Sequence, residues 1–436
     1  MRRFLVRRAR ALALFSAVLS QSAQGAGPVR AADLRGLDER IAELEQTVPL
    51  AGNRRIQLNL YGQVDRALLF WNDGFDSGTY GVDNHTSSSR FGFVGQTILG
   101  PGWTAGYRLE IETPFPSSDE VFNGPGGASA GLADTVRIRQ NYWDITAKDL
   151  GRVALGFQSP ATDDITLINL GSQINDAAVH FNSAFNIRLD LLSPPIVTGL
   201  TWGQIAHNVD SFRGNFVRYD TPVLAGVMLS TAWNNDVWDA ALRYQKGSGG
   251  FRFAGGAGYM RDDAFRFEDV RGSASLIHDA TGLYASGAGG WRNAAQTVPV
   301  NGDDAWFYYA QLGISRQWFS PGKTTFYVDR GLYRNFNVGE ILSINPDTKD
   351  EVAWGTLVDT EVHRWGFGVE QAVDSANLLL YAQAHFYDPT LVGFPCTFDP
   401  DPKNPGKTVC GGDPSQTTKL PAASWQGFVV GARIQF

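Results

Sequence analysis

From Ile56 onward, apolar and polar side chains alternate with a period of two, in runs that are long for a soluble protein. In the clearest run, 103–112, one face carries Trp103, Ala105, Tyr107, Leu109 and Ile111. Strands of soluble sheets average about 5–6 residues, whereas a tilted strand that crosses a bilayer needs about 9–11. An alternating strand can cross lipid only in a closed barrel, where every backbone group has a partner. The pattern therefore predicts an all-β transmembrane barrel.

Sixteen such runs, separated by turn residues, extend to the end of the chain. Their approximate bounds are 56–71, 88–100, 102–113, 134–146, 151–159, 213–221, 226–235, 238–246, 250–261, 268–278, 282–292, 304–318, 323–334, 360–373, 377–388 and 425–436. Closed antiparallel barrels of bacterial outer membranes have an even number of strands. Short connections such as 147–150 alternate with long ones, of which 160–212 is the longest. We expect the short turns on the periplasmic side and the long loops outside.

The N-terminus is predicted to be an export signal. Five arginines within residues 2–10 precede the apolar stretch 11–19 and small residues near Gly25. This is the pattern of a secretory signal peptide. Cleavage after Gly25 or after Ala31 would leave suitable small residues, so we expect residues 1–25, or up to 31, to be removed.

The barrel is expected to comprise residues 55–436. Residues 33–49 are predicted to form a short heptad helix before it. Its apolar positions follow spacings of 3, 4, 3 and 4: Leu34, Leu37, Ile41, Leu44 and Val48. A helix of about 15 residues is marginal on its own. It either associates with copies of itself as a coiled coil or forms an amphipathic linker, and the absence of another predicted helix favours association.

Composition and motifs argue against several other classes. Removing the five N-terminal arginines from 37 basic residues leaves 32 against 44 acidic residues, so we expect no nucleic-acid partner. The six histidines lack metal-binding spacing. Residues 127–131 match the GxSxG pattern but follow no predicted strand and precede no predicted helix. We therefore expect no catalytic residue, no metal and no cofactor.

Four segments together resemble one protein family. They are Gly62–Leu69, Ser87–Gly95, Arg213–Pro222 and the last strand, which ends in Phe436. In order and spacing they resemble the 16-stranded general diffusion porins of Gram-negative outer membranes, most closely their alphaproteobacterial branch. The resemblance implies a homotrimer in the cell outer membrane, among lipid and lipopolysaccharide, that is not an enzyme and passes small hydrophilic solutes and ions by passive diffusion. The alternatives are a substrate-selective porin, which the long 160–212 loop would suit, and a barrel acting mainly as adhesin or receptor.

The resemblance also implies a pore constriction. In the family, the loop after the fifth strand folds into the lumen, and its acidic residues face arginines on the wall. Residues 160–212 follow the fifth predicted strand. The implied constriction residues are, in the loop, Asp163, Asp164 and Asp176 and, on the wall, Arg90, Arg139 and Arg213.

Strand alternation supports a lumen-facing position for two of the arginines. Arg90 is out of phase with Phe91, and Arg139 is out of phase with Ile138 and Tyr142, which we expect to face the lipid.

Arg213 does not fit this pattern. It has the parity of Val217 and Tyr219, which should face outward. It therefore needs a bulge, or a position at the end of the loop, to reach the lumen.

Other inward charges and the strand-end aromatics leave alternatives open. Arg108, Glu110 and Glu112 either contribute to selectivity or form a solvated network. The aromatics at strand ends are expected to form an interfacial girdle rather than a sugar-stacking track: Trp71, Trp103, Trp291, Trp306 and Tyr387.

Cys396 and Cys410 lie within one long connection near the C-terminus. Export to an oxidising compartment predicts a disulfide between them. The alternative is two free thiols.

Overall fold

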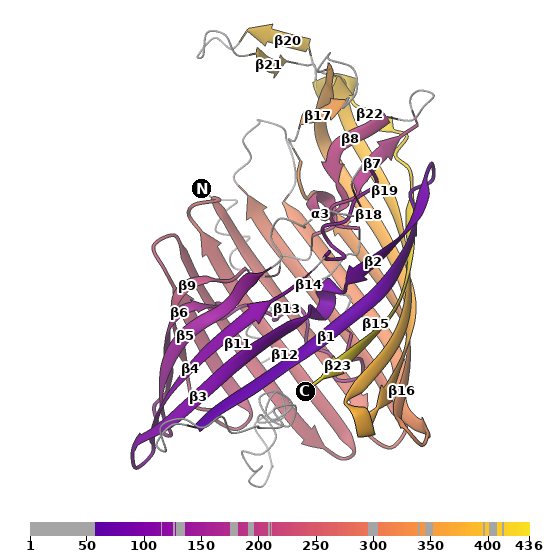
Figure 1. Ribbon diagram of the computed structural model, residues 1–436. Helices are drawn as coiled ribbons and strands as arrows, with labels where there is room; N and C mark the ends of the chain where they lie inside the picture. Colours follow the sequence, from indigo (N-terminus) through magenta and orange to yellow (C-terminus); the bar gives the residue numbers. More distant parts are fainter. Residues whose placement is uncertain are drawn as a thin grey trace.

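A closed barrel of antiparallel strands surrounds a lumen that is partly filled by one inward-folded loop (Figure 1). The computed structural model describes residues 57–436 except 115, 125–126, 128–135, 175–181, 191–195, 208–209, 211, 295–303, 339–340, 345–351, 396, 401–407 and 412–413. The predicted signal peptide and heptad helix, Asp176, Cys396 and the side chain of Cys410 lie outside the described residues.

Sixteen strands of the described chain form the wall, and all sixteen predicted runs correspond to them. They are β1 (Gln57–Asn72), β3 (Arg90–Gly100), β4 (Trp103–Glu112), β5 (Arg137–Ala147), β6 (Gly151–Gln158), β9 (Gly214–Asp220), β10 (Val227–Trp233), β11 (Val237–Ser248), β12 (Phe251–Asp262), β13 (Phe267–His278), β14 (Leu283–Ala294), β15 (Ala305–Phe319), β16 (Gly322–Arg334), β18 (Val352–Val373), β19 (Leu378–Pro395) and β23 (Trp425–Gln435). Each pairs with the next, and β23 pairs with β1 from Gln63↔Gln435 to Asn72↔Gln426. This last pairing leaves the barrel without an edge.

The outer connections carry shorter elements. These are β2 (Ser77–Asp83), η1 (His85–Ser87), β7 (Asn186–Leu189), β8 (Ile196–Thr201), α3 (Trp202–Ile205), β17 (Ile341–Ile344), β20 (Thr397–Pro400), β21 (Thr408–Gly411), η4 (Pro414–Gln416) and β22 (Thr418–Leu420). The turn η3 (Asp374–Ala376) joins β18 to β19 at the opposite end. In the described part of the chain, no helix is long and apolar enough to cross a membrane.

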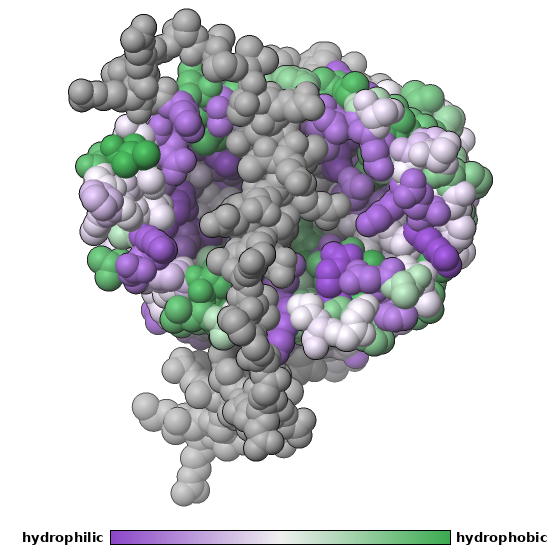
Figure 2. Space-filling view, turned by 90° about the horizontal axis from the view of Figure 1, so that it is seen from below, coloured by the Kyte–Doolittle hydropathy of each residue, from purple (hydrophilic) through white to green (hydrophobic). Residues whose placement is uncertain are grey.

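The two faces of the wall have opposite character, as the alternation predicts. On β23, Phe428, Val430 and Ile434 are exposed on the outside, while Val429 and Arg433 are buried on the inside. Seen along the barrel axis, hydrophilic residues gather around the inner rim and hydrophobic residues along the outer edge (Figure 2). The exposed apolar side chains form the surface that faces lipid.

The wall is uneven in height. Strands β18 and β19 have 22 and 18 residues, whereas β9 and β10 have 7 each. Figure 1 shows β18 and β19 rising well above the rim near β9. On the low side, the outer connections 234–236 and 263–266 are short, so the alternation of short and long connections is interrupted there.

The long loop 160–212 forms its own small structure inside the tall side of the barrel. Its β7 and β8 pair with each other, and Thr198 of β8 pairs with Ile344 of β17. The loop packs against aromatic side chains that point inward from the wall. Buried residues shared by loop and wall include Leu69, Trp71, Phe185, Ile187, Leu189, Trp202, Ile205, Tyr333, Tyr387 and Trp425.

The girdle prediction is wrong for two of its members. Trp71 and Tyr387 are 7% and 1% exposed, because both side chains point into the lumen and are covered by the loop. The ring of Trp71 lies 5.0 Å from that of Phe185 of the loop. Trp103, by contrast, is 44% exposed on the outer face.

Candidate pore constriction

The first part of the inward loop, residues 160–174, follows the inner wall and is held by polar side chains of successive strands. The wall residues that hydrogen-bond to it are Asp239 (β11), Arg271, Ser273 and Ser275 (β13), Gln311 (β15), Thr325 (β16), Glu370 (β18) and Arg433 (β23). The backbone N–H groups of Thr162, Ile168 and Leu170 donate at 2.7, 3.1 and 2.9 Å. The loop thus lines the wall from β11 to β23.

Glu370 contacts three consecutive residues of the loop. Its buried carboxylate accepts hydrogen bonds from the Gln173 and Ile174 N–H groups, at 2.9 and 3.1 Å, and from the Ser172 hydroxyl. A carboxylate that accepts hydrogen bonds from several backbone N–H groups fixes their positions, because each hydrogen bond that is lost would leave a buried donor without a partner.

Two arginines hold the start of the loop. Arg243 of β11 donates to the carbonyl oxygen of Asp163 at 2.7 Å, and Arg218 of β9 donates to the carbonyl oxygen of Pro160 at 3.1 Å. Sequence reasoning missed both residues. The alternation in their predicted strands contained the signal, since each is out of phase with the lipid-facing positions.

Arg213 reaches the same region of the loop. Its Nη2 lies 3.6 Å from Oδ2 of Asp163, whose carboxylate also accepts from the Ser159 hydroxyl. Arg213 immediately precedes Gly214, the first residue of β9, so the strand alternation does not apply to it. Of the two explanations considered, its position at the loop end is the correct one.

On the facing wall, Arg139 and Arg90 share acidic partners from β4. Nε of Arg139 lies 2.7 Å from Glu110, and Nη1 lies 3.4 Å from Glu112. Nε of Arg90 lies 3.9 Å from Glu110, which also accepts from the Tyr61 hydroxyl at 2.7 Å. Glu110 and Glu112 are therefore ion-pair partners of the predicted arginines.

Arg139 faces the lumen as its phase against Ile138 predicts, since Ile138 is 55% exposed on the outer face, but the alternation does not continue to Tyr142. The β4–β5 pairing shifts register there, since Glu110 pairs with Gln140 and Ile111 pairs with Ile138. Arg139 is the extra residue of a bulge, which reverses the alternation beyond it. Tyr142 consequently faces inward, with the Arg152 guanidinium 5.1 Å from its ring centre, so its predicted outward position is wrong.

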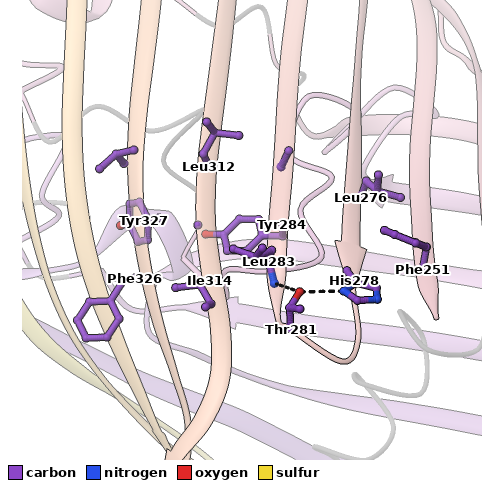
Figure 3. A pocket seen from close by; sticks show the side chains of 13 residues that line it. Phe251, Leu276, His278, Thr281, Leu283, Tyr284, Leu312, Ile314, Phe326 and Tyr327 are labelled. Atoms are coloured by element: carbon purple, nitrogen blue, oxygen red, sulfur yellow. Dashed lines mark hydrogen bonds between the residues drawn. The ribbon is translucent and has the colours of Figure 1, made fainter.

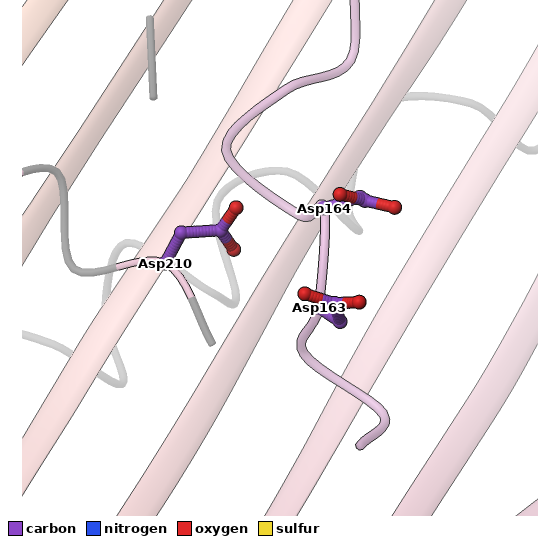
Figure 4. A group of neighbouring side chains, drawn as sticks. All are labelled: Asp163, Asp164 and Asp210. Atoms are coloured by element: carbon purple, nitrogen blue, oxygen red, sulfur yellow. The ribbon is translucent and has the colours of Figure 1, made fainter. Parts of the chain in front are cut away.

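Three acidic side chains gather where the loop starts and ends (Figure 4). One carboxylate oxygen of each of Asp163, Asp164 and Asp210 lies within 4.8 Å of the others. Repulsion from Asp163 raises the pKa of Asp164 above its ordinary value, while Arg213 and Arg139 oppose this shift. Sequence reasoning missed Asp210, although it lies only three residues before Arg213.

The structure thus brings five of the six implied constriction residues into one region, with the sixth, Asp176, outside the described residues. Asp163 and Asp164 lie on the loop, and the arginines lie on or next to β3, β5 and β9. Acidic and basic groups therefore face each other between loop and wall.

Solved structures that align with a TM-score of 0.50 or above agree with this architecture. Salmonella typhi OmpF in complex with daunomycin aligns with a TM-score of 0.51 and 11% identity, covering 88% of this chain and 98% of that one. OmpT, an outer membrane protein of Vibrio cholerae, aligns with a TM-score of 0.50 and 13% identity, covering 89% of this chain and 100% of that one. The anion-selective porin from Comamonas acidovorans aligns with a TM-score of 0.49 and 16% identity, covering 87% of this chain and 100% of that one. A comparison with curated proteins gave no match.

A sequence model described as Gram-negative porin matches residues 11–389, which is most of the chain. The match includes β1 to β18 and the whole inward loop. The chain therefore belongs to the Gram-negative porin family and forms a diffusion channel through the outer membrane.

Proposed function

We propose that this porin passes small hydrophilic solutes and ions without catalysis, through a constriction between the acidic loop residues and the wall arginines. The observation that carries the proposal is that Asp163 and Asp164 of the loop lie within electrostatic range of Arg139 on the wall. Charges of opposite sign on the two sides of a narrow aqueous passage orient water across it. An apolar solute would disturb this water without replacing its hydrogen bonds, so its passage is disfavoured.

Two measurements test this function. In planar bilayers, the purified protein should show stepwise conductance that rises in proportion to salt concentration. In liposome swelling assays, uptake of uncharged sugars should fall smoothly with their size. Absence of conductance steps would contradict the channel, and uptake independent of solute size would contradict the constriction.

A substrate-selective porin is the second candidate. The observation that favours it is the buried packing of the loop against the tall wall, which narrows the mouth on the side of β18 and β19. A selective porin should bind one solute, so that conductance saturates and the solute blocks ion current at low concentration. A general porin should show neither effect.

A homotrimer is proposed as the assembly, on the basis of the porin family and the predicted heptad helix. Outer-membrane lipid and lipopolysaccharide would surround its apolar outer surface. The adhesin or receptor role remains a separate proposal, which binding of intact cells to the purified protein would test.

A further inference from the structure

An apolar groove lies on the outer surface of the barrel, near the periplasmic ends of β12 to β16 (Figure 3). Its volume is about 770 Å³. The side chains that line it belong to neighbouring strands and include Leu276, Leu283, Leu312, Ile314, Phe326 and Val328. Leu283 and Leu312 are 56% and 61% exposed, so the groove opens toward the membrane and not toward the lumen.

A column of small residues runs up the wall from the groove. On β14, the outward positions after Leu283 are Ala285, Gly287 and Gly289. At about 3.4 Å per residue, the column from Ala285 to Gly289 is about 14 Å long. Its neighbours are small as well, since Gly287 pairs with Ala274 of β13 and Ala310 of β15.

The lower end of the groove is polar. Nδ1 of His278 lies 2.9 Å from Oγ1 of Thr281, and both residues line the groove beside the turn between β13 and β14 (Figure 3). Arg316 follows Ile314 by two residues on the same face of β15 and is exposed. A Cβ built at Gly282 would lie 3.3 Å from Cβ of Arg316, so the arginine sits against this turn.

Arg316 has an uncompensated charge at this position. No ion pair joins it to any acidic residue that the structure describes. The acid in the nearby turn, Asp279, pairs instead with Arg252 at 2.7 Å. A guanidinium at the end of an apolar groove offers forked N–H donors that match a phosphate group.

We propose that this groove binds one phospholipid of the inner leaflet, with an acyl chain along the β14 column and the phosphate at Arg316. Surrounding lipid is as apolar as the groove, so preference for a bound lipid comes from close packing and from the phosphate contact. A second copy of the barrel fits less well, because an apolar wall placed against Arg316 would leave its guanidinium without an anion.

Native mass spectrometry in mild detergent tests the site, with dioleoyl phosphatidylglycerol as the probe and dioleoylglycerol as the same lipid without phosphate. Arg316→Gln should weaken retention of the phospholipid about tenfold, equivalent to the loss of one charge-assisted contact of ~1.4 kcal/mol. Dioleoylglycerol should be retained more weakly than the phospholipid, and Arg316→Gln should leave its retention unchanged. Gly287→Leu should weaken retention of both lipids. A Cβ at Gly287 meets only the Tyr309 carbonyl oxygen, at 3.5 Å, so the larger side chain fits there and occupies the column along which the acyl chain would lie.

Two outward substitutions elsewhere on the wall serve as controls. Arg330→Gln removes an exposed arginine at the upper end of β16. Ala382→Leu places a larger side chain on β19, beside Val430 of β23. Both should retain phospholipid as the wild type does. Equal retention in Arg316→Gln and the wild type would overturn the proposal. Dissociation of the assembly by Gly287→Leu would also overturn it, since the groove would then be a contact between copies.

Discussion

Arg213 and Asp163 lie near opposite ends of the inward loop, and their side chains meet at 3.6 Å. Asp163 lies just after β6 ends at Gln158, and Arg213 lies just before β9 begins at Gly214. Because β6 and β9 are neighbours in the wall, the pair closes the base of the loop. The loop acids are thereby held beside the wall that carries Arg139 and Arg90.

Acidification should shift the ion preference of the pore toward anions before ordinary carboxylates are protonated. Repulsion from Asp163 raises the pKa of Asp164 above the ordinary value of about 3.9. Asp164 therefore takes up its proton at a higher pH than an ordinary aspartate, and the constriction loses one negative charge. Reversal potentials in a KCl gradient, recorded stepwise from pH 7 downward, measure the shift. The variant Asp164→Asn should lack it, and an identical shift in that variant would assign the titration to another group.

Glu370→Gln should loosen the inward loop without opening the wall. The amide keeps one acceptor oxygen for the Gln173 and Ile174 N–H groups, and a buried donor left without a partner costs about 1–3 kcal/mol. We expect a lower temperature of heat-induced unfolding and larger fluctuations of the open-channel current. Glu361→Gln, on the outer face of the same strand, is the matched control. Current noise equal to that of the control would show that Glu370 does not fix the loop.

The strand pattern and one part of the site could be predicted from sequence, because both depend on local alternation. Arg90 faces inward as its phase against Phe91 requires. The inward position of Tyr142 cannot be predicted in this way, because the hydrophobic pattern does not reveal the bulge at Arg139. The girdle prediction for Trp71 conflicts with the strand alternation, because Trp71 shares the inward parity of Leu69. The loop anchors could not be predicted, since Ser172 and Glu370 are 198 residues apart and no local pattern records that contact.

The predicted disulfide between Cys396 and Cys410 should be present in the exported protein. Closing a loop of about 15 residues would contribute up to ~3 kcal/mol through the entropy of the unfolded chain. Peptide maps under reducing and non-reducing conditions should differ by one cross-linked peptide. Alkylation of both thiols without prior reduction would disprove the disulfide.

Deletion of residues 33–48 should leave the barrel trimeric but lower its heat resistance. Two heptads add association energy, but they do not by themselves select a trimer over a dimer. Native mass spectrometry in mild detergent reports the assembly, and the temperature at which the trimer dissociates on gels reports its stability. A monomer from the full-length chain would exclude the trimer, and unchanged heat resistance after deletion would make the segment a linker.

The ion preference of the double variant Arg90→Ala, Arg139→Ala tests the proposed constriction most directly. The substitutions leave Glu110 and Glu112 without their ion-pair partners, so the lumen gains unbalanced negative charge. A change of roughly 1 kcal/mol would raise the permeability of K⁺ relative to Cl⁻ about fivefold. The shift should shrink at high salt, because the Debye length falls from about 8 Å at physiological ionic strength to about 3 Å at 1 M. Arg330→Ala, on the outer surface, should change nothing. Reversal potentials in a KCl gradient at low ionic strength should show this shift toward cations, and values equal to the wild type would contradict a constriction lined by these arginines.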